Sequence, residues 1–347
     1  MGWDNIINEA LSQGPRPVSD FRVKVIGVGG GGSNSISRLS KMGLNADLIA
    51  INTDEMHVRS LNVPKKVIIG KSMTRGRGTG GDMDMGERIA RQSMSTLYKV
   101  VDGADIVFVL SSLGGGTGSG AGPVIAELAK KSRALVVSIV TMPFEVEGKR
   151  RWETAQAAIE RFRGVSNTMI LLDNNRLLKL APKIPINKAF MVMDVLIGDL
   201  IKNVVETVNT PSFMNIDFSD LEAIMRRGGT STVLYGEGEY YSPEDAVVDA
   251  LNNPLMDIDY RGATGALIHV TGGPGMTLRT VYKISEGITS GIRDDAEIKI
   301  GARIDEKYRN KIKVTTILTG VHTPFAPQEN IGVEKMGALS DFIPMVY

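Results

Sequence analysis

Apolar residues in the first half of the chain form short, nearly continuous runs that end in glycine or polar segments. The runs occupy residues 22–28, 47–52, 106–110, 134–141 and 168–172. Strands that are apolar on both faces are typical of a parallel sheet covered by helices. Helical periodicity at residues 33–42 and 123–131 supplies such helices. We therefore predict an α/β fold with a Rossmann-like parallel sheet.

The pattern changes at Pro211. Before this proline, residues 187–209 read as one uninterrupted helix, about 33 Å long at 1.5 Å per residue. Beyond it, short strands alternate with amphipathic helices, at residues 231–235, 243–251, 265–271, 277–289, 297–304 and 311–318. These elements predict a long central helix followed by a smaller α+β domain.

Charge and composition disfavour several classes of protein. The chain has 347 residues, of which 40 are basic and 39 acidic, so no strong field attracts nucleic acid. It has no cysteine, and its histidines, His57, His269 and His322, are too scattered for a metal site, so we expect each to be structural or exposed. No apolar run reaches the roughly 18 residues of a membrane span, and the N-terminus lacks a signal-peptide pattern. We expect a cytoplasmic protein without membrane insertion.

A glycine run, Gly114–Gly120, lies between the apolar run 106–110 and the helical pattern 123–131. Five of its seven residues lack a Cβ, which lets backbone N–H groups point into one concave space at the start of a helix. Thr117 and Ser119 can add hydroxyl donors. The alternative is a flexible linker, but the buried strand and periodic helix on either side argue against it. The run predicts a phosphate site.

An earlier glycine cluster also follows a strand. Gly27, Gly29 and Gly32 match Gly-x-Gly-x-x-Gly, and Asp47 follows, so a dinucleotide-dependent oxidoreductase is one alternative. Such an enzyme needs one phosphate loop, whereas two suggest a longer phosphate chain. No Gly-x-x-x-x-Gly-Lys-Ser/Thr motif occurs, so we expect backbone dipoles and a cation, Mg²⁺, to meet the phosphate charge.

Five motifs follow one another along the chain: Gly29–Asn34, Asn52–Asp54, Gly114–Gly120, Pro143–Arg151 and Asn215–Asp220. Together they resemble the FtsZ family of tubulin-like cell-division GTPases, from Phe21 to Gly320. The resemblance implies GTP-driven head-to-tail polymerisation at the mid-cell division site. It divides the chain into an amphipathic extension (1–20), a GTP-binding domain (21–183), a central helix (184–210), a C-terminal α+β domain (211–320) with a catalytic loop (212–220), and a tail (321–347).

The resemblance also implies a GTP/GDP site. The positions that match the family's nucleotide contacts are Gly29, Gly30, Gly31, Gly32, Ser33, Asn34, Asn52, Asp54, Gly78, Thr79, Gly80, Gly81, Gly114, Gly115, Gly116, Thr117, Gly118, Ser119, Gly120, Glu147, Arg151, Asn174, Phe190 and Asp194. The segment 76–84 departs from the family pattern, with threonine, glycine, aspartate and methionine at positions that usually hold alanine, asparagine and proline. Its Asp82 and Asp84 suit either a cation or a solvated loop. Such variants favour an archaeal member.

The chemistry of the base site fits guanine. Phe190 can stack on a purine, and the Asp194 carboxylate, one helical turn away, can accept both the N1–H and the exocyclic amino group. Phe190 could equally be a core residue. Glu147 and Arg151 resemble the ribose-contacting pair and share one helix face by their spacing, although a surface ion pair is the alternative.

The resemblance assigns hydrolysis to Asn215, Asp217 and Asp220. These residues follow the end of the central helix, whereas Phe190 lies near its start. Asp217 would then act on nucleotide bound to the next subunit of a filament, because it cannot reach its own. The alternative is a scaffold paralogue that assembles but has lost hydrolysis. Within the tail, residues 339–347 form an apolar ending that could dock on a membrane-tethering adaptor or fold back on the body.

Overall fold

The computed structural model describes residues 21–180, 183, 185–209, 212–252 and 259–322. The predicted N-terminal extension (1–20), Pro211 and nearly all of the predicted tail (321–347) lie outside these residues. Among the described residues, no helix combines the length and the apolar composition needed to cross a membrane.

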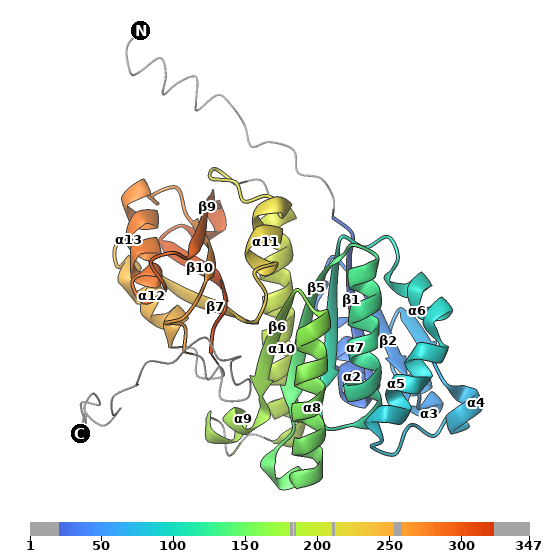
Figure 1. Ribbon diagram of the computed structural model, residues 1–347. Helices are drawn as coiled ribbons and strands as arrows, with labels where there is room; N and C mark the ends of the chain where they lie inside the picture. The colour runs from blue at the N-terminus through green and yellow to red at the C-terminus, as the bar shows by residue number, and fades with distance from the viewer. Residues whose placement is uncertain (1–20, 181–182, 184, 210–211, 253–258, 323–347) are drawn as a thin grey trace, which may run out of the picture.

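A parallel sheet forms the first part of the molecule (Figure 1). Its strands follow the spatial order β3-β2-β1-β4-β5-β6, with bounds β1 (Val23–Val28), β2 (Asp47–Asn52), β3 (Lys65–Ile68), β4 (Ile106–Ser112), β5 (Leu135–Met142) and β6 (Thr168–Asp173). The chain adds β2 and β3 on one side of β1 and then continues with β4 on its other side, so the strand order reverses between β1 and β4. Strand β1 pairs in parallel with both β2 and β4. In such sheets the carboxyl ends of the strands at this reversal form the usual ligand crevice.

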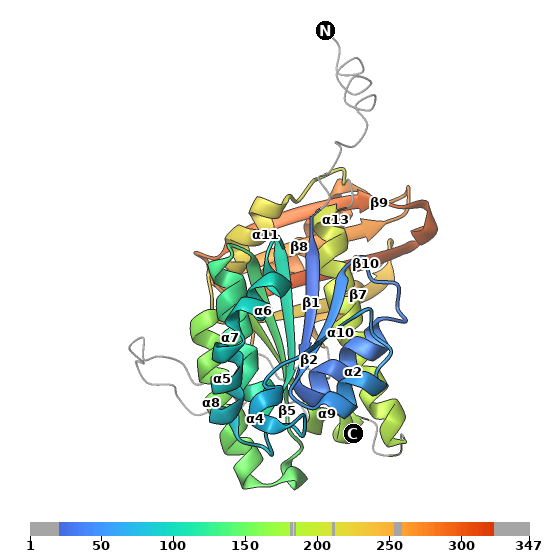
Figure 2. The same cartoon turned by 90° about the vertical axis from the view of Figure 1, so that its right-hand side faces the viewer.

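Helices cover both faces of this sheet, which explains why its strands are apolar throughout. One face packs on α2 (Gly29–Leu39) and α10 (Ile186–Asn209). The other packs on α5 (Met83–Gln92), α6 (Met94–Val101), α7 (Gly116–Lys131) and α8 (Lys149–Val165), and Figure 2 shows the two layers from the side. Short helices complete the connections: α3 (Glu55–Ser60), α4 (Lys71–Thr74), η1 (Glu145–Glu147) and α9 (Asn174–Leu180).

The remaining strands continue the same sheet. β7 (Thr230–Glu239) pairs in parallel with β6 at only Met169↔Thr230 and Ile170↔Ser231. Beyond β7 follow β10 (Lys311–Thr319), β8 (Gly265–Gly272) and β9 (Glu297–Ile304), with antiparallel pairing except between β8 and β9. Helices α11 (Phe218–Met225), α12 (Pro243–Leu251) and α13 (Leu278–Thr289) and the short η2 (Glu306–Tyr308) accompany them.

This arrangement confirms the predicted mixed α/β fold class and adds a connection that the sequence did not reveal. One ten-stranded sheet runs through both parts, although the β6–β7 contact is short and the last strands have a separate apolar core with α12 and α13. The numbered domain boundaries stay a prediction.

Two helices begin earlier than predicted. Helical periodicity placed their starts at residues 33 and 123, but α2 begins at Gly29 and α7 at Gly116. Glycine has poor helix propensity, so the pattern placed both glycine runs in loops. In the fold, much of each run forms the first turns of a helix whose later residues are held by the core.

Candidate functional site

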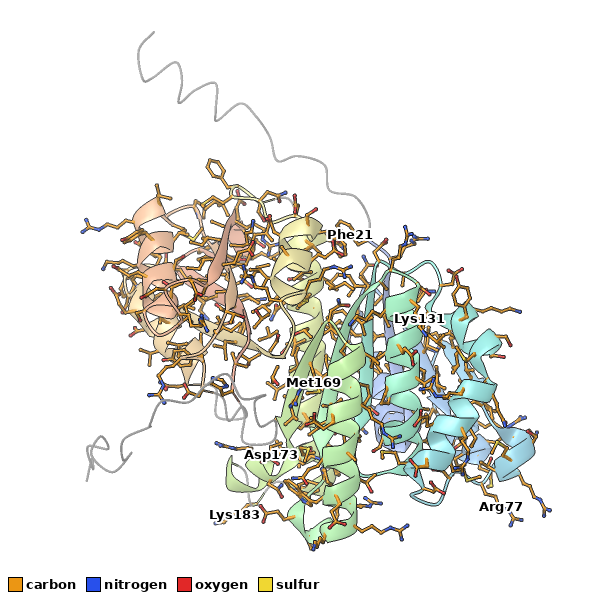
Figure 3. The ribbon with its side chains drawn as sticks, in the orientation of Figure 1. Phe21, Arg77, Lys131, Met169, Asp173 and Lys183 are labelled. Carbon is orange, nitrogen blue, oxygen red and sulfur yellow. The ribbon has the colours of Figure 1, made fainter. Side chains whose placement is uncertain are left out.

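A cavity of about 630 Å³ opens at the carboxyl ends of β1, β2, β4 and β5. In Figure 3 the labelled Arg77 and Asp173 mark this end of the molecule, and Phe21 marks the opposite end. Eighteen of the predicted nucleotide residues line the cavity: Gly30, Gly31, Asn34, Asn52, Asp54, Gly78, Thr79, Gly80, Gly81, Gly115, Gly116, Thr117, Gly118, Glu147, Arg151, Asn174, Phe190 and Asp194.

The first turns of α2 and α7 face this cavity. Neither helix has a side chain that caps its first N–H groups, because residues Val28 and Gly115 occupy the N-cap positions. Uncapped N–H groups together with the positive end of the helix dipole favour an anion. The two turns pack closely, since a Cβ on Gly29, whose φ is +74°, would lie 2.7 Å from the Gly118 nitrogen.

Hydroxyl groups add to this end of the cavity. The Thr117 Oγ1 lies 2.7 Å from Thr53 Oγ1 and 3.4 Å from Thr79 Oγ1. A Cβ on Gly116 would lie 2.2 Å from Thr79 Oγ1 and 2.5 Å from the Asp82 carbonyl oxygen. The loop that carries Thr79 therefore rests directly on the start of α7 because Gly116 has no side chain.

Six predicted residues lie behind the cavity wall instead of lining it. They are Gly29, Gly32, Ser33, Gly114, Ser119 and Gly120. The Ser119 Oγ is fully buried and accepts a hydrogen bond from the Gly114 N–H at 3.0 Å, and the predicted donation by its hydroxyl to phosphate stays a prediction. Ser33 is also fully buried, and its Oγ lies 3.5 Å from the Ile51 carbonyl oxygen.

Asp82 and Asp84 both have protein partners, and their predicted choice between a cation and a solvated loop stays a prediction. The Asp82 carboxylate caps α5 by accepting from the Met85 N–H at 2.9 Å. Asp84 pairs with Arg161 at 3.0 Å. Neither residue lines the cavity. No cluster of three or more histidine, aspartate or glutamate side chains with metal-binding geometry occurs within the described residues.

One part of the cavity is lined by Phe190 and Asp194 on α10. The Phe190 ring packs edge-on against Phe144, with centroids 6.0 Å apart and planes at 73°. Asp194 is 4% exposed and forms an ion pair with Arg38 of α2. Phe190 is half-buried and lines the cavity, so it is not a residue of the closed core.

Glu147 and Arg151 form the expected pair on one face. Arg151 donates to Glu147, whose other oxygen accepts from the Phe144 N–H at 2.9 Å. The pair therefore fixes the segment that carries Phe144 to the start of α8. Asn174, at the start of α9, lines the same wall.

The three predicted catalytic residues lie far from this cavity. Phe218 stacks on Phe21, with ring centroids 4.8 Å apart, which places the start of α11 beside the amino end of β1. The cavity is at the carboxyl end of that strand. Asn215 and Asp217 are exposed, and α10 spans 24 residues, or about 36 Å, between the two regions. Figure 1 shows α11 and α9 at opposite ends.

The loop that carries these residues is held to β9. Met214 and Ala302 exchange backbone hydrogen bonds of 3.0 Å, and Ile216 is buried. Asp217 and Asp220 form a capping box, in which each carboxylate accepts from the other residue's N–H.

Asp220 also has a cationic partner. Its carboxylate pairs with Lys299 at 2.8 Å. Burial opposes ionisation of Asp220, but the hydrogen bonds from Lys299 and Asp217 outweigh it, so the pKa of the carboxyl is below its usual range.

The chain is similar in sequence to known proteins over both of its parts. The GTPase domain of the Tubulin/FtsZ family matches residues 22–182, and the C-terminal domain of the FtsZ family matches residues 229–322. The protein named cell division protein FtsZ 2 of Halobacterium salinarum is 44% identical over 306 residues, which cover 88% of this chain and 78% of the relative. The protein of the same name from Methanocaldococcus jannaschii is 44% identical over 310 residues, which cover 88% of this chain and 81% of the relative.

The chain belongs to the FtsZ family. The solved structure of the empty FtsZ dimer from M. jannaschii is similar throughout, with a TM-score of 0.78, 35% identity and coverage of 97% of this chain and all of that one. Family membership confirms the predicted resemblance, and the chain is a cell-division GTPase of a protofilament-forming family. The oxidoreductase alternative is wrong.

The cavity of this FtsZ-family chain also contains residues that the sequence did not predict there. Arg38 lies one helical turn after Asn34 on the same face of α2, a spacing that could have revealed it. His57, expected to be structural or exposed, lines the cavity and hydrogen-bonds to Asn34 and Asn52. The expectation of a structural residue is confirmed for His269, which is buried, and burial lowers its pKa to about 4.

Proposed function

We propose that the cavity binds GTP and GDP, with the phosphates at the starts of α2 and α7. The uncapped N–H groups of both helices support this placement because they are donors without a side-chain partner. Glu147, Arg151 and Asn174 contact the ribose region. Phe190 stacks on the base, and Asp194, oriented by Arg38, accepts from guanine.

We further propose that Mg²⁺ accompanies the triphosphate. Mg²⁺ in nucleotide sites is usually held by phosphate oxygens and water with one or two protein ligands, so the lack of a carboxylate cluster among the described residues fits this role. The Thr117 hydroxyl, at the phosphate end of the cavity, is the protein ligand that we propose. The ion would neutralise charge that develops on the phosphates during hydrolysis.

GTP hydrolysis, in this proposal, takes place between two subunits that stack head to tail. The observation that carries it is the exposure of Asn215 and Asp217 at the end of the molecule opposite the cavity. Stacking places this loop over the phosphates of the next subunit, where Asp217 would polarise the attacking water, Asn215 would orient it and Asp220 would hold the loop. Such an interface leaves one free end at each side and so propagates into a filament.

An apolar groove beside the loop supports the same contact. It is lined by α13, β9 and Met214, and its side chains include Leu278 (75% exposed) and Tyr282 (65% exposed). Large exposed apolar side chains that lie together favour a protein interface. We assign this groove to the longitudinal contact.

The rate of GTP hydrolysis at different protein concentrations tests the proposal. If the active site forms between subunits, activity per molecule is negligible below a threshold concentration and rises steeply above it. Activity per molecule that stays constant over a 100-fold range around about 1 µM would show that each subunit hydrolyses GTP alone.

Assembly at the mid-cell division site is part of the proposal, with residues 339–347 as the docking segment for a membrane-tethering adaptor. The apolar sequence of this segment supports it. Deletion of the segment should release filaments from the division site in cells but leave GTP hydrolysis unchanged. Unchanged localisation would exclude the docking role.

A further inference from the structure

A chain of hydrogen bonds crosses the edge of the cavity through His57. The Thr53 N–H donates to Asn52 Oδ1 at 2.8 Å, and the Asn52 Nδ2 lies 3.2 Å from His57 Nδ1. On the other side of the ring, His57 Nε2 lies 2.9 Å from Asn34 Oδ1. The chain thereby links the end of β2, the short helix α3 and the second turn of α2.

The direction of every bond in this chain is fixed by its first member. A backbone N–H can only donate, so the Asn52 oxygen must face Thr53 and its amino group must face His57. The His57 Nδ1 must then accept, which places the ring proton on Nε2. That proton can only go to the Asn34 oxygen, so the amino group of Asn34 faces away from His57.

Asn34 lines the cavity, and within the described residues its amino group forms no hydrogen bond to another protein group. It lies on α2 between the glycine turn, which faces the phosphates, and Arg38, which orients the base-binding Asp194. An N–H donor at this position matches an oxygen acceptor of the nucleotide. A freely rotating asparagine would present its oxygen as often as its amino group, and the oxygen would repel a phosphate.

We propose that His57 is a positioning residue for nucleotide binding, because it holds the Asn34 amide with its N–H donors toward the bound guanine nucleotide. This inference rests on the proposed nucleotide site but not on filament formation. His57 acts on affinity through the orientation of the Asn34 amide.

The test measures GDP affinity of the full chain at concentrations below assembly, by titration calorimetry, with two substitutions of His57 and one control substitution on the same helix. His57→Phe keeps a ring of similar shape but loses both nitrogens, and should weaken GDP binding about tenfold, the effect of one hydrogen bond. His57→Gln keeps one donor and one acceptor and should recover most of the affinity. Arg59→Ala on the same helix, whose side chain pairs with Glu55 at the surface, is the matched control and should bind as the wild type does.

A second substitution tests the direction of the amide. Asn34→Asp still accepts from His57 but presents an oxygen to the nucleotide, so it should weaken GDP binding more than His57→Phe does.

The outcomes separate this inference from the site itself. If the wild type does not bind GDP, the proposed nucleotide site is wrong. If the wild type binds and His57→Phe binds equally well, or His57→Gln is no better than His57→Phe, the positioning role is wrong and the site stands.

Discussion

The two ends of the subunit begin their helices in opposite ways. At the cavity, α2 and α7 start with glycine and have no side-chain cap. At the other end, α11 starts with a capping box made by Asp217 and Asp220. The first arrangement leaves N–H donors for an anionic ligand, whereas the second satisfies those donors internally and leaves acidic groups at the surface.

In the proposed function, this difference separates nucleotide binding from GTP hydrolysis within one chain. The cavity carries the uncapped helix starts to which we assign the phosphates. The exposed loop carries the Asp217 carboxylate to which we assign the activation of water. Each end is thus incomplete alone, and each prediction below alters one end while the other serves as the internal control.

Removal of the Asp217 carboxylate should have the largest effect. Asp217→Asn keeps the cap of α11, since asparagine caps as well as aspartate, but removes the charge. Hydrolysis in assembled protein should fall by about 100-fold or more, as for loss of a general base. GDP affinity should be unchanged. Ser219→Ala in the same turn is the control, and a steady-state GTPase assay measures both.

Asp217→Ala removes cap and charge together. It should lose hydrolysis as the asparagine variant does and also cost about 1 kcal/mol of stability from the missing cap. Full activity in Asp217→Asn would contradict the proposed role of the charge.

Alteration of the base site should have the next largest effect. Arg38 only donates, so in Asp194→Asn the amide oxygen will face Arg38 and the amino group will face the base. That group meets the N–H donors of guanine, and GDP affinity should fall on the order of 30-fold. A xanthine nucleotide carries an oxygen in place of the exocyclic amino group of guanine. Its affinity for this variant should be higher than its affinity for the wild-type protein. Equal loss for both nucleotides would mean that Asp194 does not contact the base.

A charge placed in the apolar groove should have a more moderate effect, on assembly. Leu278→Glu places a charge in the proposed interface and should raise the threshold concentration for assembly about tenfold, measured by sedimentation. Val248→Glu is the matched control, because Val248 is also exposed but lies on α12, outside the groove. An equal rise in both variants would assign the effect to general surface charge.

Removal of the Asp220–Lys299 ion pair should have the smallest effect, a small loss of stability. Because its folded-state pKa is lowered, Asp220 contributes stability that is complete above the usual aspartate pKa and is lost as the pH falls through the lowered value. Lys299→Met should therefore lower the melting temperature by no more than about 2 °C at neutral pH. In calorimetric scans the difference from the wild type should vanish in acid. A difference that persists in acid would have another cause.

The sequence predicts best where its residues mark the ends of an element. Helix α12 and strand β9 have the predicted bounds because Pro243 begins the first and the polar turn before Glu297 begins the second. The predicted starts of α2 and α7 were too late, because the conformation of the glycine runs at Gly29 and Gly116 is set by packing and not by helix propensity. The edge strand β3 was missed because it is short and exposed.

The site shows the same limit. The predicted nucleotide residues make up most of the cavity lining, and most of them stand in short contiguous segments of the sequence. They do not reveal that Ser119 is turned inward by the Gly114 N–H, or that Arg38 meets a residue 156 positions away. These pairings depend on the tertiary fold, which brings distant segments of the chain together.

Mixing two inactive variants tests the separation of binding and hydrolysis most directly. Asp217→Ala keeps the cavity, and Asp194→Asn keeps the loop. At a GTP concentration too low for the second variant to bind, each protein alone should hydrolyse GTP poorly. If the active site forms between subunits, an equal mixture should recover about a quarter of the wild-type rate, because one junction in four joins an intact cavity to an intact loop. A mixture that only sums the two separate rates would contradict the account.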